Sequence, residues 1–417
     1  MAGEMNSHHA VDLRHVVVIA GEESGDVLGG RLCEALRARF PNIRLSGVGG
    51  TSMRNSGGES AASTPPVFEN LFEMTDLSVM GLVEVLPALP RILRRMKQVV
   101  THIHATRPDL VITIDAPDFN FRVAKRVRAL CPDIKLIHYV APTVWAWRAG
   151  RAQKIAAFLD GLMCVLPFEP PYFEPYGLAA RYVGHPLTAK IDPLPSRDEA
   201  RENLGLSRDA QLVCLLFGSR KGEVKRLGAD LAAVLRLVDG RRSDTVFLIP
   251  ALPHVKGLIE EALAKARVTA SDQLRFIAPQ DRYMAFRAVD CAVAVSGTVG
   301  LELAYAGTPH CIAYRMNRLS FAIGKQLVKV AFAHLGNIMM GRRVFPEFIQ
   351  DDCKPQDIAD FVEQVLAGGD VSDMRRGIAD IKNLIRHTKN GKTSKSAADQ
   401  AIDFIIDVLR CSAHQSS

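Results

Sequence analysis

Residues 109–121 read DLVITIDAPDFNF, an apolar run that ends on charged residues. Every position of LVITI is apolar or β-branched, which is typical of a strand buried on both faces of a parallel sheet. The run ends at Asp115, and Pro117 and Asp118 follow it. Ligands in α/β sheets bind beyond the carboxyl ends of the strands, so we expect this strand to deliver a carboxylate to a site.

Similar apolar runs alternate with helical patterns along the chain, which predicts an α/β fold with doubly wound parallel sheets. The proline- and charge-rich stretch 184–210 separates two series of runs and is predicted to be a linker. We expect Rossmann-like domains at 1–190 and 191–365, with a cleft between them. Segment 366–417 is expected to be helical, and the sequence does not fix its packing partner. The predicted strands are 15–21, 44–50, 109–115, 135–142, 161–167, 211–218, 245–252, 274–280, 291–297 and 310–315, and the helices of the first series are 26–39, 120–131 and 149–159.

The composition limits the classes of function. Of 417 residues, 48% are apolar and 23% are charged, and no apolar run reaches the roughly 18 residues that span a bilayer. The N-terminal residues lack the apolar core of a signal peptide, so we expect a cytoplasmic protein. The net charge of +7 favours anionic partners. A nucleic-acid binder ranks last, because only 6% of residues are aromatic and no basic stripe interleaves with them.

The first strand runs into AGEESGD at 20–26 instead of the glycine pattern of a dinucleotide site. The carboxylates of Glu22, Glu23 and Asp26 would repel a pyrophosphate. We therefore expect this turn to receive a neutral or hydroxyl-bearing group, with Glu22 and Ser24 as the candidate residues. An alternative is that Ser24 and Asp26 only cap the helix that follows.

The two aspartates of the IDAPDFN turn are expected to have different roles. A partly desolvated carboxylate at a strand end can accept a proton from a hydroxyl nucleophile, so Asp115 is the predicted base. Asp118 is predicted to cap a helix that begins near Asn120 and so to hold the turn. The alternative is that both aspartates are structural.

The stretch HYVAPTVWAWR at 138–148 holds both tryptophans of the chain. Core packing is the commoner role of such aromatic residues. Their position just after a predicted strand favours a cleft wall that includes Trp147 and Arg148. His138 lies inside the apolar run and His185 lies near the predicted linker, and neither is predicted to be catalytic.

The second series of strands carries a glycine turn in LLFGSRKGEV at 215–224. Free amides at the start of the next helix, together with the guanidinium of Arg220, would bind a diphosphate. They would also stabilise the charge of a departing nucleotide. Gly218 and Ser219 are the other candidate residues of this turn.

A second glycine turn occurs in VSGTVGLE at 295–302. Ser296, Gly297 and Thr298 are predicted to face phosphate at a helix start. Glu302, one turn into that helix, is predicted to accept hydrogen bonds from ribose hydroxyls. Each turn alone is a weak signal, and the two in one domain favour nucleotide binding.

Residues 77–100 are dense in Leu, Val, Met and Ile and also carry basic side chains. Such a segment is commonly core, but this composition is also typical of a helix in a membrane interface. Pro87 and Pro90 are predicted to split it into two short helices. Residues 319–332 are a second, weaker candidate. The predicted membrane contacts are Val79, Met80, Leu82, Val83, Leu86 and Leu89.

Several motifs closely resemble those of the lipid-A-disaccharide synthase family: GEESGD, VMGLVEVL, IDAPDFN, HYVAPTVWAWR, LPFE, VGHP, GSR, SGT with LE, and YRM. The resemblance covers about residues 15–353. It implies a GT-B glycosyltransferase of family 19, with two Rossmann-like domains facing a central cleft. The implied reaction is inverting and joins UDP-2,3-diacylglucosamine to 2,3-diacylglucosamine 1-phosphate through a β-1,6 linkage, with release of UDP. The resemblance also implies a cytoplasmic enzyme attached peripherally to the inner membrane of Gram-negative bacteria, and a homodimer is a candidate assembly.

Matched residue by residue, Asp115 corresponds to the family's essential aspartate, Arg220 to its essential arginine, and Glu22 to an acidic residue of the acceptor half. Phe217 replaces the proline of the family's LPGSR pattern, and Gly336 replaces that of its LPN pattern. No DxD metal motif is present, since Asp115 and Asp118 are three positions apart, so we expect no metal requirement and no cofactor. The residues and the resemblance together give the predicted substrate-binding residues Ser24, Asp118, Asn120, Trp147, Gly218, Ser219, Ser296, Gly297, Thr298, Glu302, Arg315, Asn337 and Gln350.

Two alternatives stay open. Another UDP-sugar enzyme of this architecture, such as an epimerase or a muramyl-lipid glycosyltransferase, would turn over an unacylated nucleotide sugar. A non-catalytic nucleotide-sugar-binding protein would bind UDP without releasing it. The carboxylate expected at the cleft argues against the second alternative.

Overall fold

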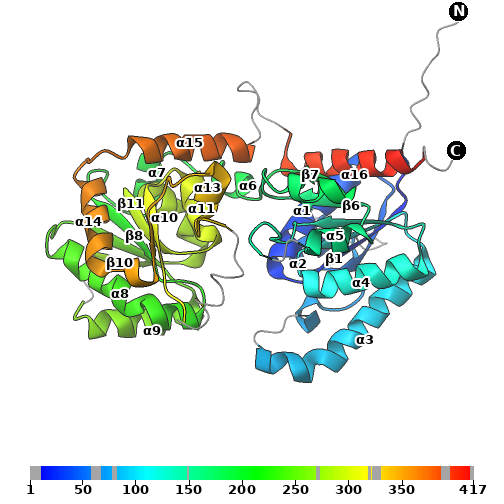
Figure 1. Cartoon of the computed structure of the whole chain (residues 1–417), viewed down its shortest axis with the longest axis horizontal. Helices are drawn as coiled ribbons and strands as arrows, with labels where there is room; N and C mark the ends of the chain where they lie inside the picture. The colour runs from blue at the N-terminus through cyan, green and yellow to red at the C-terminus, as the bar shows by residue number, and fades with distance from the viewer. Residues whose placement is uncertain are drawn as a thin grey trace, which may run out of the picture. The chain divides into compact units, whose positions relative to one another are not determined.

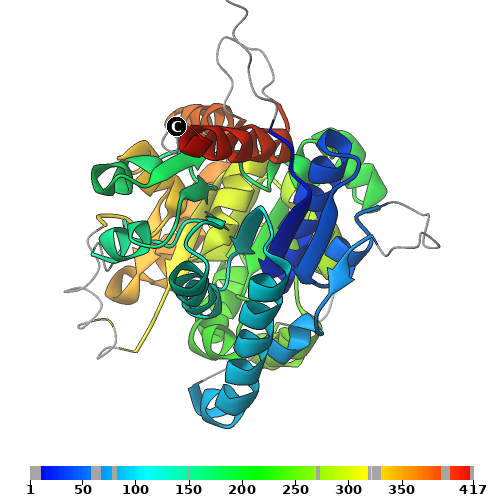
Figure 2. The same cartoon turned by 90° about the vertical axis from the view of Figure 1, so that its right-hand side faces the viewer.

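The computed structural model describes residues 11–57, 67–77, 82–147, 150–268, 273–317, 321, 330–386 and 395–413. It divides the chain into two compact units, each built around one sheet (Figures 1 and 2). The first unit comprises Met1–Pro186 and Thr393–Ser417, and the second comprises Leu187–Lys392. The segment 366–417, expected as one helical segment, is therefore shared between the two units.

The first unit contains a seven-stranded sheet in the order β3-β2-β1-β4-β5-β6-β7, and all neighbouring strands are parallel. The five strands predicted in this half of the chain are confirmed, and β1, β4 and β6 are buried at every position. The short strands β3 and β7 were not predicted. The strands are β1 (His15–Ala20), β2 (Arg44–Val48), β3 (Glu69–Asn70), β4 (Leu110–Ile114), β5 (Lys135–Tyr139), β6 (Gly161–Cys164) and β7 (Ala179–Tyr182).

Helices cover both faces of this sheet. Helices α3 and α4 pack on one face, while α1 and α16 lie side by side on the other (Figure 1). Helix α16 also contacts β6, where a Cβ on Gly161 would come within 3.1 Å of the Phe404 ring. The helices are α1 (Glu23–Arg39), α2 (Thr51–Arg54), η1 (Met74–Leu77), α3 (Leu82–Thr106), α4 (Pro117–Leu130), α5 (Arg151–Ala156), η2 (Pro170–Tyr172), η3 (Glu174–Tyr176) and α16 (Ala397–Ala413).

Helix α3 is continuous, so the prediction that Pro87 and Pro90 divide it is wrong. Each proline removes one backbone hydrogen bond, but the later turns of the helix are fixed by packing. Met96, Val99 and Ile103 recur at helical spacing and are fully buried in the core of the sheet. The burial of this apolar face outweighs the local cost of the two prolines.

The second unit contains a six-stranded parallel sheet in the order β10-β9-β8-β11-β12-β13. All five strands predicted in this half are confirmed, and the three-residue strand β13 was not predicted. The strands are β8 (Leu212–Leu216), β9 (Val246–Pro250), β10 (Leu274–Ile277), β11 (Cys291–Val295), β12 (His310–Tyr314) and β13 (Glu347–Ile349). The helices are α6 (Thr188–Ile191), α7 (Arg197–Asn203), α8 (Lys221–Asp239), α9 (Pro253–Lys265), η4 (Pro279–Asp281), α10 (Arg282–Ala288), α11 (Thr298–Ala306), α13 (Leu335–Met340), η5 (Gln350–Asp352), α14 (Pro355–Leu366) and α15 (Ser372–Arg386).

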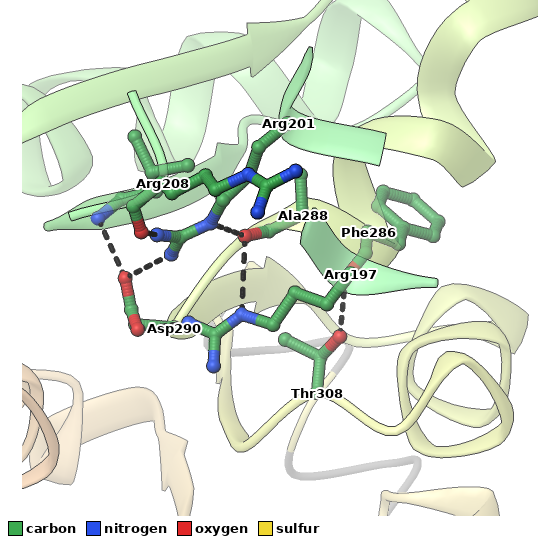
Figure 3. Close-up of polar contacts among 8 residues, drawn as sticks. Arg197, Arg201, Arg208, Phe286, Ala288, Asp290 and Thr308 are labelled. Carbon is green, nitrogen blue, oxygen red and sulfur yellow. Dashed lines mark hydrogen bonds and ion pairs between the residues drawn. The ribbon is translucent and has the colours of Figure 1, made fainter. Parts of the chain in front are cut away.

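Most of the predicted linker 184–210 is folded and belongs to the second unit. Arg201 is 4% exposed and bonds Asp290 at 2.9 Å and the carbonyl of Ala288 at 2.9 Å. Arg197 forms a second ion pair with Asp290 (Figure 3). Asp290 also accepts the amide of Leu212 at the start of β8. The charged residues Arg197 and Arg201 therefore anchor α7 to the amino ends of β8 and β11 through Asp290.

Candidate functional site

A cavity of about 460 Å³ lies at the carboxyl edge of the second sheet. Leu216, Pro250 and Val295, the last residues of β8, β9 and β11, line it. This is the edge at which parallel sheets bind ligands. The structure brings together in this cavity all seven residues named from the two glycine turns, which are Gly218, Ser219, Arg220, Ser296, Gly297, Thr298 and Glu302.

The first glycine turn joins β8 to α8 and is already occupied by a carboxylate. Oε2 of Glu223 accepts the amide of Ser219 at 3.0 Å and that of Arg220 at 3.1 Å. We expected these amides to be free, and this expectation is wrong because Glu223 stands three positions after the N-cap, where a glutamate reaches back to the helix start. The guanidinium of Arg220 is 84% exposed and lies 3.5 Å from Oε1 of Glu223.

The second glycine turn joins β11 to α11. Ser296 follows the strand and its hydroxyl donates to the carbonyl of Ala333 at 3.4 Å. Helix α11 begins at Thr298 with no side-chain cap, as expected of a helix start that faces a ligand. Packing behind the helix is close, because a Cβ on Gly300 would lie 2.5 Å from Nε2 of His334.

Glu302 reaches the cavity from the second turn of α11, with a side chain that is 15% exposed. Burial raises the pKa of Glu302, and the charge of Arg282, whose guanidinium lies 3.4 Å from Oε1, limits the rise. Arg282 lines the same cavity and was not predicted. It follows no glycine turn and stands at the start of α10, so the sequence offers no local signal for it.

Other cavity residues could have been found from the strand rule alone. Ala251 and Leu252 directly follow β9, and Pro279 follows β10. Neither segment carries a glycine turn, and this is why they were not predicted. Glu223 carries a clearer signal, since a glutamate three residues after a helix start is the pattern of a capping box.

Three residues that the family resemblance nominates lie elsewhere in the second unit. Asn337 is fully buried, and its side chain bonds the backbone of Val344 and Phe345 and the carboxylate of Glu347. These bonds use its polar groups to fix the chain before β13. The polar atoms of Asn337 are thus bonded to the protein itself in this structure.

Arg315 and Gln350 are likewise bonded within the protein. Nε of Arg315 lies 2.9 Å from Oδ2 of Asp230 on α8. Oε1 of Gln350 accepts the amide of Met316 at 2.8 Å, and its Nε2 donates to the carbonyl of the same residue at 3.3 Å. Asn337, Arg315 and Gln350 are not among the residues that line the cavity at the two glycine turns.

In the first unit, Asp115 stands at the carboxyl end of β4 in a strained turn. Its φ is +51° and that of Ala116 is +41°, a region that non-glycine residues adopt at a cost. Oδ1 of Asp115 accepts the amide of Ala116 at 2.9 Å, and Oδ2 accepts the hydroxyl of Ser24 at 3.2 Å. Strain at a strand end is common at functional sites, where the surrounding structure maintains it.

Asn120 holds this turn. It is fully buried, and its Nδ2 donates to the carbonyls of Ile114 at 3.0 Å and Asp115 at 2.7 Å. The prediction that Asp118 caps the helix is wrong, because α4 begins at Pro117 and its N-cap residue makes no side-chain bond. The Asp118 carboxylate is 99% exposed and lies 3.8 Å from the guanidinium of Arg151.

Glu22 lies beside Asp115 at the end of β1. Partial burial raises the pKa of Glu22, and the charge of Asp115 adds to the rise. The alternative that Asp26 caps α1 is wrong, because Asp26 accepts the amides of Gly50, Ser52 and Met53 at the start of α2. Glu22, Ser24 and Asp115 therefore form a cluster, whereas Asp26 is structural.

The two tryptophans differ in their surroundings. Trp145 is buried and its indole donates to Oε1 of Glu169 at 3.3 Å. Glu169 is itself buried, which raises its pKa to about 7. Trp147 is 40% exposed, and Arg148 lies outside the described residues. Trp145 thus packs in the core, whereas Trp147 is partly exposed at the surface after β5.

The predicted membrane contacts fall largely outside the description. Val79 and Met80 are not among the described residues, nor are the side chains of Leu82, Val83 and Leu86. Of those predicted, only Leu89 can be placed, and it is half-buried. Within the parts of the chain that the structure describes, we find no helix with the length and apolar character to cross a bilayer.

In the described ranges, no cluster of three or more acidic, histidine or cysteine side chains is placed to hold a metal ion.

Comparison with known proteins gives one consistent family. Residues 16–401 match the family model described as lipid-A-disaccharide synthetase. The lipid-A-disaccharide synthase of Rhodospirillum centenum is 40% identical over 393 residues, which cover 94% of each chain. That of Ruegeria pomeroyi is 41% identical over 83% of this chain and 85% of its own.

Solved structures of other enzymes share the fold. The UDP-GlcNAc 2-epimerase of Neisseria meningitidis, bound to UDP-GlcNAc, matches with a TM-score of 0.58 at 9% identity, over 95% of this chain and all of its own. The calicheamicin glycosyltransferase matches with a TM-score of 0.55 at 14% identity, over 95% of this chain and 99% of its own. At such low identity these matches show the two-domain α/β fold alone.

Proposed function

The chain belongs to the lipid-A-disaccharide synthase family, and from this premise we propose how its two units share the reaction. It is a glycosyltransferase of lipid A biosynthesis. The proposed donor is UDP-2,3-diacylglucosamine and the proposed acceptor is 2,3-diacylglucosamine 1-phosphate. The products are the β-1,6-linked disaccharide 1-phosphate and UDP.

The donor nucleotide is assigned to the cavity of the second unit. The observation that carries this assignment is the convergence of two glycine turns and Glu302 on one cavity. Helix α11 begins after Gly297 without a side-chain cap, so its first backbone amides favour phosphate oxygens. The turn after Gly218 lines the same cavity, but its amides are bonded by Glu223 in this structure. The exposed guanidinium of Arg220 adds a positive charge that can bond a diphosphate through two parallel hydrogen bonds.

The nucleoside is assigned to the other side of the same cavity. Glu302 is held near the surface of the cavity by Arg282 and keeps acceptor oxygens for ribose hydroxyls. A carboxylate that is paired and largely buried keeps a fixed position, so it can discriminate between ribose and a sugar without those hydroxyls.

The base is assigned to Asp115 in the first unit. In the proposed step Asp115 takes the proton of the acceptor 6-hydroxyl, and that oxygen forms a bond to the anomeric carbon of the donor. The bond from this carbon to UDP breaks on the opposite side, so the configuration inverts and UDP departs with the electron pair. Ser24 and Asn120 fix the Asp115 turn, which orients the carboxylate before the acceptor binds.

The membrane association is assigned to α3. Leu93 is 41% exposed on this helix, beside the exposed Arg91 and Arg94. Apolar and basic side chains together suit the interface of a membrane that contains anionic lipid. We propose a cytoplasmic protein that attaches peripherally to the inner membrane, where its acylated substrates reside. A homodimer is a further proposed assembly.

The test is UDP release by the purified full chain supplied with UDP-2,3-diacylglucosamine, with and without the acceptor. The proposed function requires release that depends on the acceptor. Release without acceptor would instead indicate a hydrolase or an epimerase-like enzyme. Bound UDP with no release in either reaction would indicate a binding protein.

A further inference from the structure

In the nucleotide cavity, the amides of the first glycine turn are already bonded by a carboxylate of the protein itself. Glu223 accepts the amides of Ser219 and Arg220, and its other oxygen faces the Arg220 guanidinium. Its side chain is 13% exposed and lines the cavity. A phosphate group that used this turn would need the same two amides and the same arginine.

The turn is shaped to admit this carboxylate. Gly218 has a φ of +105°, and a Cβ at this position would come within 2.8 Å of both Cβ and Oε2 of Glu223. Glycine is therefore required both for the backbone conformation and for the space that Glu223 occupies. The backbone of this turn therefore depends on glycine at 218, since any larger residue there would displace the side chain of Glu223.

A carboxylate and a phosphate cannot share these donors without strong repulsion. Each is stabilised by charge-assisted bonds to amides and to arginine, and two anions a few ångströms apart in a partly buried site repel each other. The phosphate must therefore replace Glu223, and the carboxylate must replace the phosphate when the nucleotide leaves. The exchange keeps the amides of Ser219 and Arg220 bonded in both states.

We propose that Glu223 is a built-in competitor of the diphosphate, which lowers the affinity of the cavity for UDP and assists its release. This inference rests on the proposed function, since it takes the ligand to be a nucleoside diphosphate. It assigns Glu223 an influence on phosphate affinity and none on the nucleoside. UDP bound less tightly leaves sooner after transfer, so the residue favours turnover over product retention.

The test is calorimetric titration of the wild type and of Glu223→Gln with UDP, uridine and inorganic pyrophosphate. Glutamine is tolerated at this position of a capping box, so the helix start is retained while the charge is removed. We expect the Kd for UDP to fall about tenfold, which equals about 1.4 kcal/mol. The Kd for pyrophosphate should fall similarly and that for uridine should not change.

Controls separate this inference from the function on which it rests. Glu260→Gln removes a 52% exposed carboxylate from α9, outside the cavity, and should change none of the three affinities. If the wild type binds UDP and Glu223→Gln binds it equally or more weakly, the inference is wrong while the nucleotide site stands. If UDP and uridine both bind more tightly, the effect lies outside the phosphate site and the inference is also wrong.

Two further outcomes are decisive. If neither protein binds UDP or uridine, the nucleotide site and the inference fall together. Thermal unfolding shows whether each variant is folded. If Glu223→Gln does not fold, Glu223→Ala replaces it in the titrations. The alanine variant also lacks the competing carboxylate, so tighter UDP binding is expected of it and weaker binding would contradict the inference.

Discussion

The hydroxyl of Ser24 donates a hydrogen bond to Oδ2 of Asp115 at 3.2 Å, which links the turn after β1 to the turn after β4. A close approach of the same turns is visible at Gly21, where a Cβ would lie 2.5 Å from that of Ala116. The carboxylate is thus positioned from two strands at once. Such positioning before the substrate arrives is what a general base requires.

Replacing Asp115 by asparagine should slow turnover by about 10²–10⁴-fold, the usual contribution of general-base catalysis. Asparagine keeps the size of the side chain and an oxygen that can accept the amide of Ala116, so the turn should remain folded. The measurement is acceptor-dependent UDP release at saturating donor. Asp133→Asn, at an 82% exposed aspartate of the same unit, is the matched control. Near-normal turnover by a folded Asp115→Asn protein would remove Asp115 from the role of base.

Replacing Arg220 by alanine should reduce kcat by about 10²–10³-fold. Loss of one hydrogen-bond donor that stabilises the charge developing in the transition state lowers kcat by this factor in other enzymes. Lysine should restore part of the loss, since it keeps the charge but not the planar fork. Stability should change little, as the guanidinium is 84% exposed. The control is Arg236→Ala in the last turn of the same helix. A kcat unchanged in Arg220→Ala would show that the arginine does not act on the leaving group.

The fold was largely predictable because burial on both faces imposes a composition on central strands. Strands such as β4 and β11 are apolar or β-branched at nearly every position, and this pattern is visible without a structure. The edge strands β3 and β13 are two and three residues long and only half-buried, so they leave no comparable pattern. The return of α16 to the first unit depends on which surface its apolar face covers, and sequence spacing does not specify a partner.

The site was predictable where its geometry is local. Both glycine turns are contiguous in sequence, and they do converge on one cavity. Arg282 lies in that cavity through tertiary packing and has no sequence neighbour in either turn. We predicted that Asp118 holds the Asp115 turn, but Asn120 does so. The reason is that α4 starts at Pro117, three residues before the predicted start at Asn120. That shift places Asn120 inside the helix, where it is buried under the turn, and leaves Asp118 in solvent.

Replacing Leu89 and Leu93 together by serine should release the protein from vesicles that contain anionic phospholipid. Each leucine buried in the membrane contributes about 1.5–3 kcal/mol, so loss of both should lower the partition coefficient by about a hundredfold or more. The measurement is sedimentation with vesicles. Leu384→Ser removes a leucine that is 41% exposed on α15 in the second unit and should have no effect. Added salt should also weaken vesicle binding, because it screens the charges of the basic residues of α3. If the two serines leave vesicle binding unchanged, this face of α3 is not the membrane contact.

The buried carboxyl group of Glu169 should make the stability of the first unit depend on pH. Burial raises its pKa from 4.5 to about 7, while its bonds to Leu166 and Trp145 oppose the rise. In this interval the folded state therefore binds a proton that the unfolded chain has released. Stability must then fall as the pH rises from about 4.5 to about 7.

The contribution of this group should approach about 3 kcal/mol across the interval, at about 1.4 kcal/mol for each pKa unit. Glu169→Gln cannot ionise, so its free energy of unfolding should lack this part of the pH dependence. The difference between wild type and variant isolates the group from other titrating residues. The measurement is chemical unfolding at a series of pH values, followed by the fluorescence of the buried Trp145 in a Trp147→Phe background. If the stabilities of the two proteins change in parallel with pH, the pKa of Glu169 is not raised by folding. If the wild type gains stability relative to the variant as the pH rises, folding lowers the pKa of Glu169 and the prediction is wrong.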